Sequence, residues 1–277
     1  MPLDPHTRQI VALAWSRILG LPDDSLTGLV GASGASCSPS GPSRPARLEV
    51  PTDGDGPSSG RPVEGEARRA EGEDEQVATF LRLYGASVLY GPRWLLDAVR
   101  DVDDEVLALE STFIRLGASH RGRSLGEAAL YYADGVPQLE RSETLAVSYE
   151  TDHARQLESL CPADDVAEAG LSGLDSTFTL VPDDGTQAGL HGSADPVAGS
   201  GYEEWQGLIG QVGVLVRPDV RRLGLGAYAA AVAMEEAFTE GLVPQWRARM
   251  GHRASQHLAD TLGFELAGSQ TTVVLEP

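Results

Sequence analysis

Hydrophobic and polar positions form their clearest pattern near residue 216. Valines occupy every second position of the run 212–216, and because Pro218 cannot pair in a ladder we expect a strand that ends near Arg217. From Gly226 the chain continues AYAAAVAMEEAF, a run of good helix formers that ends before Gly241. The pattern therefore predicts a strand, a short loop and a helix in direct succession.

Weaker patterns of the same two kinds run through the rest of the chain. Their residues predict further elements both before and after this segment. The expected helices are 5–19, 94–99, 104–116, 153–160 and 252–262. The expected strands lie in 77–90, 127–132, 145–149, 243–250 and 267–275.

Composition shifts divide the chain into four expected parts. A helical segment, 1–30, precedes a stretch rich in glycine, serine, proline and acidic residues, 31–76, which we interpret as a flexible low-complexity insert. An α/β region, 77–150, shows no chemical signature. The last part, 151–277, is the domain that carries the strand, loop and helix described above. A second polar loop, 182–201, lies within it.

The loop between the strand and the helix has the composition of an anion site. It is Arg221-Arg222-Leu223-Gly224-Leu225-Gly226. Its glycines allow the backbone to approach a ligand, and the start of the helix offers unpaired N–H groups at its positive end. Arg217 and the two loop arginines add positive charge. We expect the loop to bind phosphate, the alternative being a glycine turn without a ligand.

The same glycines also satisfy the pattern G-x-G-x-x-A, so a dinucleotide site has to be considered. In that motif the strand runs almost directly into the first glycine, and an acidic residue closes the next strand about 20 residues later. Here six residues separate Arg217 from Gly224, and the next strand, 245–249, contains no carboxylate. The spacing disfavours a dinucleotide.

The arrangement resembles motif A of the GCN5-related N-acetyltransferases (GNAT), whose loop signature is Q/R-x-x-G-x-G/A. The helix and turn that end at Gly263-Phe264 also resemble this family. The resemblance is strong over 205–275, weak back to 152 and almost absent before that. It implies an α+β GNAT acyl-CoA N-acyltransferase fold with a mixed twisted sheet flanked by helices. On this basis 151–277 is the acetyltransferase domain and 77–150 a family-specific region.

The resemblance also implies acetyl-coenzyme A as co-substrate. The backbone of Val214, Leu215 and Val216 is then expected to pair with the pantetheine arm. The N–H groups from Arg222 to Ala227 are expected to hold the pyrophosphate, and the strands carrying Val216 and Gln245 to part. The full set of expected binding residues is Val214, Leu215, Val216, Arg221, Arg222, Leu223, Gly224, Leu225, Gly226 and Ala227.

The catalytic positions depart from the family pattern. The resemblance places Ala259 where many members carry a tyrosine that protonates the leaving thiolate, and His252 where they carry asparagine. Arg247 stands where some N-terminal-amine acetyltransferases have a glutamate, which disfavours that class. Ser255 and His252 are candidate donors, since the spacing of 252, 255 and 259 shares one helix face. The alternative is that both residues only cap the helix.

A candidate proton acceptor lies in the strand before the loop. Glu203 and Glu204 alternate between the two faces of this strand, so at most one of them points toward the site. We select Glu204, which shares a face with Tyr202 and Gln206. Asp175 is a weaker candidate. The alternative for each is a solvated or turn carboxylate.

Charge narrows the possible partners. The net charge is −20, and all 21 basic residues are arginine. Nucleic acid and anionic membranes both require positive patches, so neither is an expected partner. A cationic amine would be attracted, although the acidity could serve solubility alone. The arginine-rich, lysine-free composition is typical of a high-GC bacterial sequence, as in an actinobacterial-type member of the family.

Cysteine and histidine indicate neither a disulfide framework nor a metal site. Cys37 lies in the polar insert and Cys161 precedes a proline, while the six histidines are scattered. The apolar pattern of the first 20 residues lacks a basic start, and no apolar run is long enough to cross a membrane. We expect a cytoplasmic protein.

These patterns predict an N-acetyltransferase that moves an acetyl group from acetyl-coenzyme A directly to a primary amine of a small molecule or peptide. Neither cysteine lies in a matched motif, so a covalent acyl-enzyme lacks a nucleophile. One alternative is a non-catalytic acyl-coenzyme A-binding regulatory module, and another is a binder of a different nucleotide phosphate. The acceptor and the oligomeric state are not encoded in any pattern.

Overall fold

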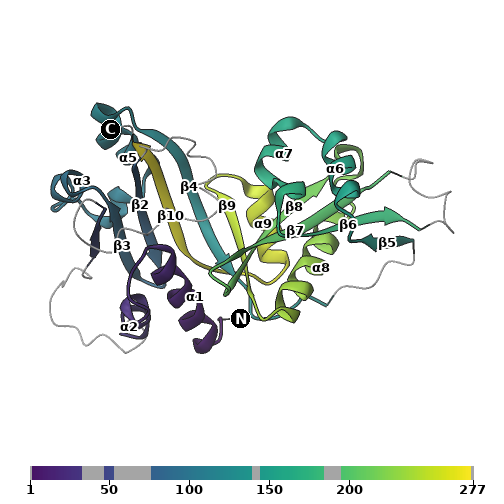
Figure 1. Ribbon diagram of the computed structural model, residues 1–277, viewed down its shortest axis with the longest axis horizontal. Helices are drawn as coiled ribbons and strands as arrows, with labels where there is room; N and C mark the ends of the chain where they lie inside the picture. The colour runs from purple at the N-terminus through teal and green to yellow at the C-terminus, as the bar shows by residue number, and fades with distance from the viewer. Residues whose placement is uncertain (1, 33–46, 53–75, 139–143, 184–194, 276–277) are drawn as a thin grey trace. The chain divides into compact units, whose positions relative to one another are not determined.

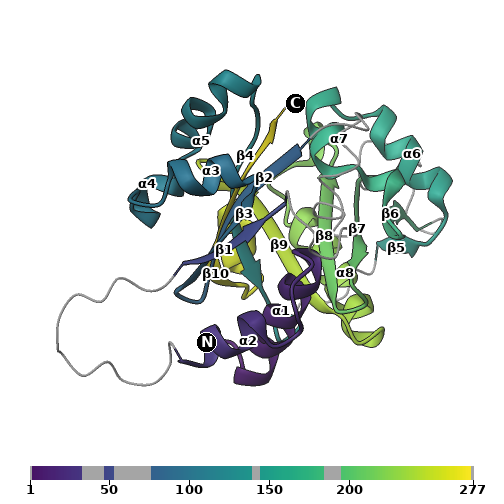
Figure 2. The same cartoon turned by 60° about the vertical axis from the view of Figure 1, so that its left-hand side comes forward.

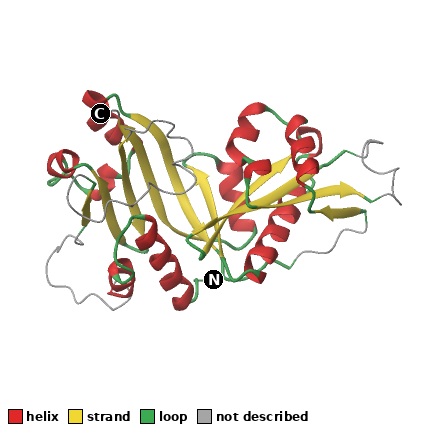
Figure 3. Ribbon diagram, viewed as in Figure 1, coloured by secondary structure: helices red, strands yellow, loops and turns green. Residues whose placement is uncertain are grey.

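The computed structural model describes residues 2–32, 47–52, 76–138, 144–183 and 195–275 (Figure 1, Figure 3). The chain divides into two compact units. We call residues 2–131, 247–253 and 266–277 the amino-terminal unit, and residues 132–246 and 254–265 the glycine-loop unit. Each unit combines a mixed sheet with helices, which confirms the expected α+β class.

The sheet of the glycine-loop unit has the strand order β9-β8-β7-β6-β5. Strands β5 to β8 pair antiparallel with their neighbours, whereas β8 and β9 are parallel. A parallel pair needs a crossover, and helix α8 (Leu225–Thr239) supplies it. The strands are β5 (Leu145–Ser148), β6 (Ser176–Pro182), β7 (Ala198–Trp205), β8 (Ile209–Val216) and β9 (Val243–Arg249).

Helices cover both faces of this sheet (Figure 1). On one face, Leu215 packs in a buried cluster with residues of α6 (Thr151–Ser159) and of the short helix η3 (Leu171–Gly173). On the other face α8 lies so close that a Cβ on Gly210 would be 3.2 Å from Ala237 Cβ. The odd positions of β8 therefore face α6, and the even positions face α8.

Two further helices complete the glycine-loop unit. Helix α7 (Ala163–Ala169) lies on the α6 face, where a Cβ on Gly213 would be 2.9 Å from the Ala169 carbonyl oxygen. Helix α9 (Arg253–Thr261) follows β9. The expected helices at 153–160 and 252–262 are thus confirmed, with shifts of one or two residues at their ends.

The amino-terminal unit is built on strands in the order β1-β3-β2-β10-β4. Strand β2 pairs antiparallel with β3 and β10, and β1 is parallel to β3. Figure 2 shows α3, α4 and α5 together on one side of these strands. The elements are α1 (Pro5–Ile18), α2 (Ser25–Ala32), β1 (Leu48–Pro51), β2 (Gln76–Leu83), β3 (Ala86–Gly91), α3 (Arg93–Ala98), α4 (Asp104–Leu107), α5 (Glu110–Gly117), β4 (Arg123–Tyr132) and β10 (Glu265–Leu275).

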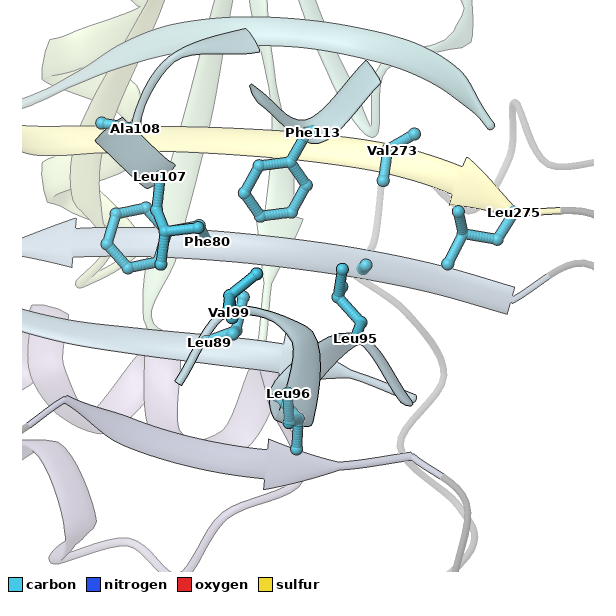
Figure 4. Packing of buried hydrophobic residues seen from close by; sticks show 11 residues of the cluster. Phe80, Leu89, Leu95, Leu96, Val99, Leu107, Ala108, Phe113, Val273 and Leu275 are labelled. Atoms are coloured by element: carbon cyan, nitrogen blue, oxygen red, sulfur yellow. The ribbon is translucent and has the colours of Figure 1, made fainter. Parts of the chain in front are cut away.

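One hydrophobic core of the amino-terminal unit lies between its strands and α3 to α5 (Figure 4). Phe80 from β2 and Phe113 from α5 are buried there. Leu95 and Leu107 bring α3 and α4 to the same cluster. The three short helices are therefore stabilised by the apolar surface they bury together, since helices of this length are marginal alone.

Strand β1 lies inside the stretch that we expected to be a flexible insert. Residues 48–51 pair with β3, and the guanidinium of Arg47 donates to the carbonyl oxygens of Val99 and Val102 at 2.9 and 3.1 Å and to Asp104 Oδ1 at 3.0 Å. A low-complexity composition gives no hint of these tertiary bonds. Residues 33–46 and 53–75 of the expected insert lie outside the described part of the chain.

Candidate functional site

The loop between β8 and α8 exposes backbone N–H groups. Arg222 and Gly224 both adopt left-handed conformations, with φ of 66° and 81°. Gly224 is the N-cap of α8 and has no side chain to bond the first turn, and the first helical bond runs from Tyr228 N to the Gly224 carbonyl at 3.0 Å. The N–H groups of residues 225–227 are thus left without helical acceptors, as an anion site requires.

Gly226 allows three elements to meet at the start of α8. A Cβ at this position would lie 3.3 Å from Val216 Cγ2 and 3.6 Å from Leu258 Cδ2. Its backbone conformation is not left-handed, so an added side chain here would be opposed by close packing against β8 and α9 and not by backbone strain.

Two of the three arginines near the loop already have carboxylate partners. Arg217 is buried and pairs with both oxygens of Asp219, at 2.7 and 3.1 Å. Arg221 forms an ion pair with Asp165 of α7 at 2.6 Å and donates to the Val216 carbonyl at 3.2 Å. Arg222 is exposed and has no carboxylate partner among the described residues. Its guanidinium is therefore the charge available for a ligand, whereas the other two arginines shape the loop.

Strands β8 and β9 pair over only three positions. The last pair is Gln211 with Gln245, and beyond it the register gives 212–216 a partner in β7 but none in β9. The ladder between β8 and β9 therefore ends before Val216, and the parting of the two strands stays a prediction.

Hydrogen-bonded side chains occupy the point where pairing ends. Gln245, whose side chain is fully buried, donates from Nε2 to Gln211 Oε1 at 2.5 Å and accepts from the Tyr132 hydroxyl at Oε1. Gln211 is half-buried and donates to the Val212 carbonyl at 3.2 Å. We call Tyr132, Gln245 and Gln211 the amide chain.

The strand register separates the two glutamates of β7. Glu203 lies opposite Gln211, so these side chains share the face that also carries Gln245. Glu204 lies opposite Gly210, on the α8 face, and its exposed side chain points away from the amide chain. The catalytic role of Glu204 stays a prediction, but the register favours Glu203 as the carboxylate nearest the strand opening.

Local hydrogen bonds give Glu203 and Asp175 defined positions. Glu203 is half-buried and its Oε2 accepts from the indole N–H of Trp205 at 3.1 Å. Asp175 Oδ2 accepts from the backbone N–H of Glu204 at 2.8 Å, so its carboxylate stabilises the start of β6 against β7. Of the candidate carboxylates, Glu203 is the one that both faces Gln211 and is held in place.

Helix α9 places the remaining catalytic candidates. Ser255 is half-buried and its hydroxyl oxygen accepts from the indole N–H of Trp246 at 3.0 Å. Ala259 is fully buried and its methyl group carries no proton to donate, at the position where the resemblance leads us to expect a tyrosine. His252 is exposed and precedes the first residue of α9, so it does not share a helical face with Ser255. Roles for Ser255 and His252 in catalysis stay predictions.

Sequence reasoning overlooked the amide chain. Gln211 and Gln245 are far apart in the sequence, and Tyr132 comes from a strand to which we assigned no chemistry. The available signal was Gln211 in an otherwise apolar strand and Gln245 in the apolar start of another, Val243 to Trp246, because a buried amide requires partners.

Cys161 is half-buried, and burial raises the pKa of its thiol. Within the described ranges no group of three histidine, cysteine, aspartate or glutamate side chains could hold a metal ion. None of the described helices combines the length and apolar character needed to cross a membrane.

Several solved structures are similar to this chain at low identity. A GCN5-related N-acetyltransferase from Sphaerobacter thermophilus is 13% identical with a TM-score of 0.43, over 99% of this chain and 94% of the other. A GCN5-related N-acetyltransferase-like protein from Streptococcus suis is 16% identical with a TM-score of 0.42, over 74% and 85%. A GNAT-family protein from Novosphingobium aromaticivorans is 20% identical with a TM-score of 0.43, over 56% and 67%.

The comparison of sequences is more specific than these superpositions. No curated protein matches the chain. The model of the GNAT acetyltransferase family, however, matches residues 204–272, which include β8, β9, the glycine loop, α8 and α9. Over residues 204–272 the chain is therefore similar to the GNAT acetyltransferase family.

Proposed function

We propose that the glycine-loop unit binds acetyl-coenzyme A and transfers its acetyl group directly to a primary amine of a small molecule or peptide. The observation that carries the proposal is the joint presence, inside the family match, of an open helix start at 225–227 and of strands that stop pairing at Gln211 and Gln245. A phosphate site and an opening for an extended arm then lie along one strand.

The residues of the loop fit the pyrophosphate of coenzyme A. The N–H groups of residues 225–227 have no helical acceptors, and Arg222 supplies an exposed positive charge. The space beside Gly224 is open, since no atom lies within 4 Å of where its Cβ would be. Beyond the last β9 pair, the backbone of Val214, Leu215 and Val216 can pair with an amide-containing arm as a strand would.

When bound, the co-substrate supplies an acetyl thioester, whose C–S bond breaks as the amine nitrogen bonds to the acetyl carbon. The amine must give up a proton in this exchange. We assign its acceptance to Glu203, directly or through water, because Glu203 faces Gln211 and is oriented by Trp205. We assign protonation of the leaving thiolate to the hydroxyl of Ser255, which is positioned by Trp246, in place of the missing family acid.

The alternative is a module that binds an acyl-coenzyme A without turnover. It is favoured by one observation, the full burial of Ala259 where the family tyrosine would stand. In that case the loop would hold the ligand, and the bound state would act through assembly or regulation.

Calorimetric titration with acetyl-coenzyme A tests the binding half of the proposal, with ADP as the comparison ligand. Release of free thiol in the presence of a panel of primary amines tests the transfer half. Binding with turnover supports the proposal, and binding without turnover across the panel supports the module. If acetyl-coenzyme A does not bind, both are wrong, and ADP binding as tightly as acetyl-coenzyme A would indicate a general nucleotide-phosphate site.

A further inference from the structure

The amide chain lies at the position where the pairing of β8 with β9 ends. Gln245 is fully buried, and each half of its amide is bonded, Oε1 by the Tyr132 hydroxyl and Nε2 to Gln211. Tyr132 is fully buried as well. All three side chains belong to the glycine-loop unit, and none of them is used in the mechanism proposed above.

A pantetheine arm that starts at the glycine loop and runs along β8 would end near the amide chain. Val216 lies five positions after Gln211, and a strand rises about 3.3 Å per residue, so this stretch spans roughly 16 Å. The extended pantetheine arm is of comparable length. A pyrophosphate at residues 222–227 therefore brings the thioester to the neighbourhood of Gln211, where strand pairing has just ended.

We infer that Tyr132, Gln245 and Gln211 form the floor of the acyl site and restrict the acyl group to acetyl. The inference rests on the proposed binding of acetyl-coenzyme A and adds the determinant of its acyl selectivity. Gln211 and Gln245 are the first side chains that an acyl group would meet at the closed end of the two strands.

Hydrogen bonding makes this floor resist displacement. An apolar floor can yield by changing rotamers, but Gln245 cannot move without losing its bonds to both Tyr132 and Gln211. A longer acyl chain would also place apolar groups against amides that need partners. We therefore expect each added methylene to lower acyl-coenzyme A affinity or kcat/KM by roughly 10- to 200-fold.

Substitutions that shorten or release the floor test this inference. Gln245→Ala removes the central side chain, and Tyr132→Phe removes only the hydroxyl bond. The matched control is Gln156→Ala, an exposed glutamine of α6 bonded to Asp195. Affinities for free coenzyme A, acetyl-, propionyl- and butyryl-coenzyme A are measured by calorimetry, and kcat/KM is measured wherever turnover is found.

Wild type and Gln156→Ala should bind acetyl-coenzyme A at least about 100-fold more tightly than butyryl-coenzyme A, which carries two additional methylenes. Gln245→Ala should reduce this preference to about twofold or reverse it, and Tyr132→Phe should reduce it partially. Both should bind free coenzyme A as wild type does, because the loop remains intact. A purely structural role would instead weaken every ligand equally.

The possible failures are distinct. If wild type binds butyryl-coenzyme A as tightly as acetyl-coenzyme A, or if Gln245→Ala binds free coenzyme A normally but keeps the wild-type preference, the floor assignment is wrong while the proposed cofactor stands. If wild type binds no coenzyme A derivative, both the proposed function and the assignment of the acyl floor are wrong.

Discussion

The two ends of β8 present different kinds of site. At the end near Val216 the groups available to a ligand are backbone N–H groups, with one exposed arginine beside them. At the end near Gln211 they are side chains from three strands, joined by hydrogen bonds. The first site depends on local conformation, and the second on tertiary pairing.

This difference explains why the phosphate-binding loop is better supported by the sequence than the catalytic side chains are. A backbone site needs glycines, a strand end and a helix start, all of which lie within a few residues of each other. A side-chain site needs the register of strands that are distant in the sequence. Substitutions at the two ends should therefore have different effects. Those in the loop should weaken acetyl-coenzyme A binding, and those at the inner end should lower turnover or acyl selectivity.

The largest expected effect follows from a negative charge in the loop. Gly226→Asp should weaken acetyl-coenzyme A binding by roughly 1000-fold, because it adds a negative charge to the helix start proposed to hold the pyrophosphate, and like charges brought close cost several kcal/mol. Calorimetric titration measures the loss. The added Cβ would also lie 3.3 Å from Val216 Cγ2, so Gly226→Ala is the control that adds the same carbon without charge. Equal losses in both variants would mean that packing, and not phosphate binding, explains the glycine.

A smaller effect is expected from the carboxylate at the inner end. Glu203→Gln should lower kcat by about 100-fold and leave acetyl-coenzyme A affinity unchanged, since it removes a proton acceptor and not a binding group. Steady-state kinetics with a responsive amine measures both. Glu204→Gln, on the opposite face of β7, is the matched control and should retain activity. The reverse result would restore Glu204 as the base.

The glutamates also show where prediction from sequence ends. Alternation established that Glu203 and Glu204 point to opposite faces, but it did not indicate which face carries Gln211. That choice depends on the register, and the register is set by the hairpin turn at Gln206 and Gly207, both with positive φ. Alternation therefore placed the two glutamates on opposite faces, but only the register identifies Glu203 as the one on the face of Gln211.

Elements with strong local signals were predicted closely. The strand expected to end near Arg217 ends at Val216, and the helix expected from Gly226 spans Leu225–Thr239. Strand β1 was missed because its order comes from pairing with β3 and from Arg47. The bonding of Gln211 to Gln245 was missed for a similar reason, since it exists only once β8 and β9 are side by side.

A moderate effect should distinguish the loop arginines. Arg222→Gln should weaken acetyl-coenzyme A binding about tenfold, the value of one charge-assisted bond, and the loss should shrink as salt is added. Arg221→Gln should have a smaller effect, because Arg221 is already paired with Asp165. Titrations at two salt concentrations measure this difference. A larger loss for Arg221 would mean that its ion pair with α7 holds the loop in its binding conformation.

The smallest effect is expected at Cys161, which lies outside both ends of β8. Direct transfer needs no thiol nucleophile, and burial raises the pKa of Cys161, so at neutral pH less of it is thiolate than of an ordinary cysteine. Cys161→Ala should therefore keep kcat within about twofold of wild type, and alkylation of Cys161, followed by peptide mass spectrometry, should accelerate only as the pH rises above the usual thiol range. If Cys161→Ala abolished turnover but retained acetyl-coenzyme A binding, transfer would proceed through an acyl-enzyme on Cys161 and not directly. The catalytic site would then lie at the connection between α6 and α7, which carries Cys161, and not at the inner end of β8.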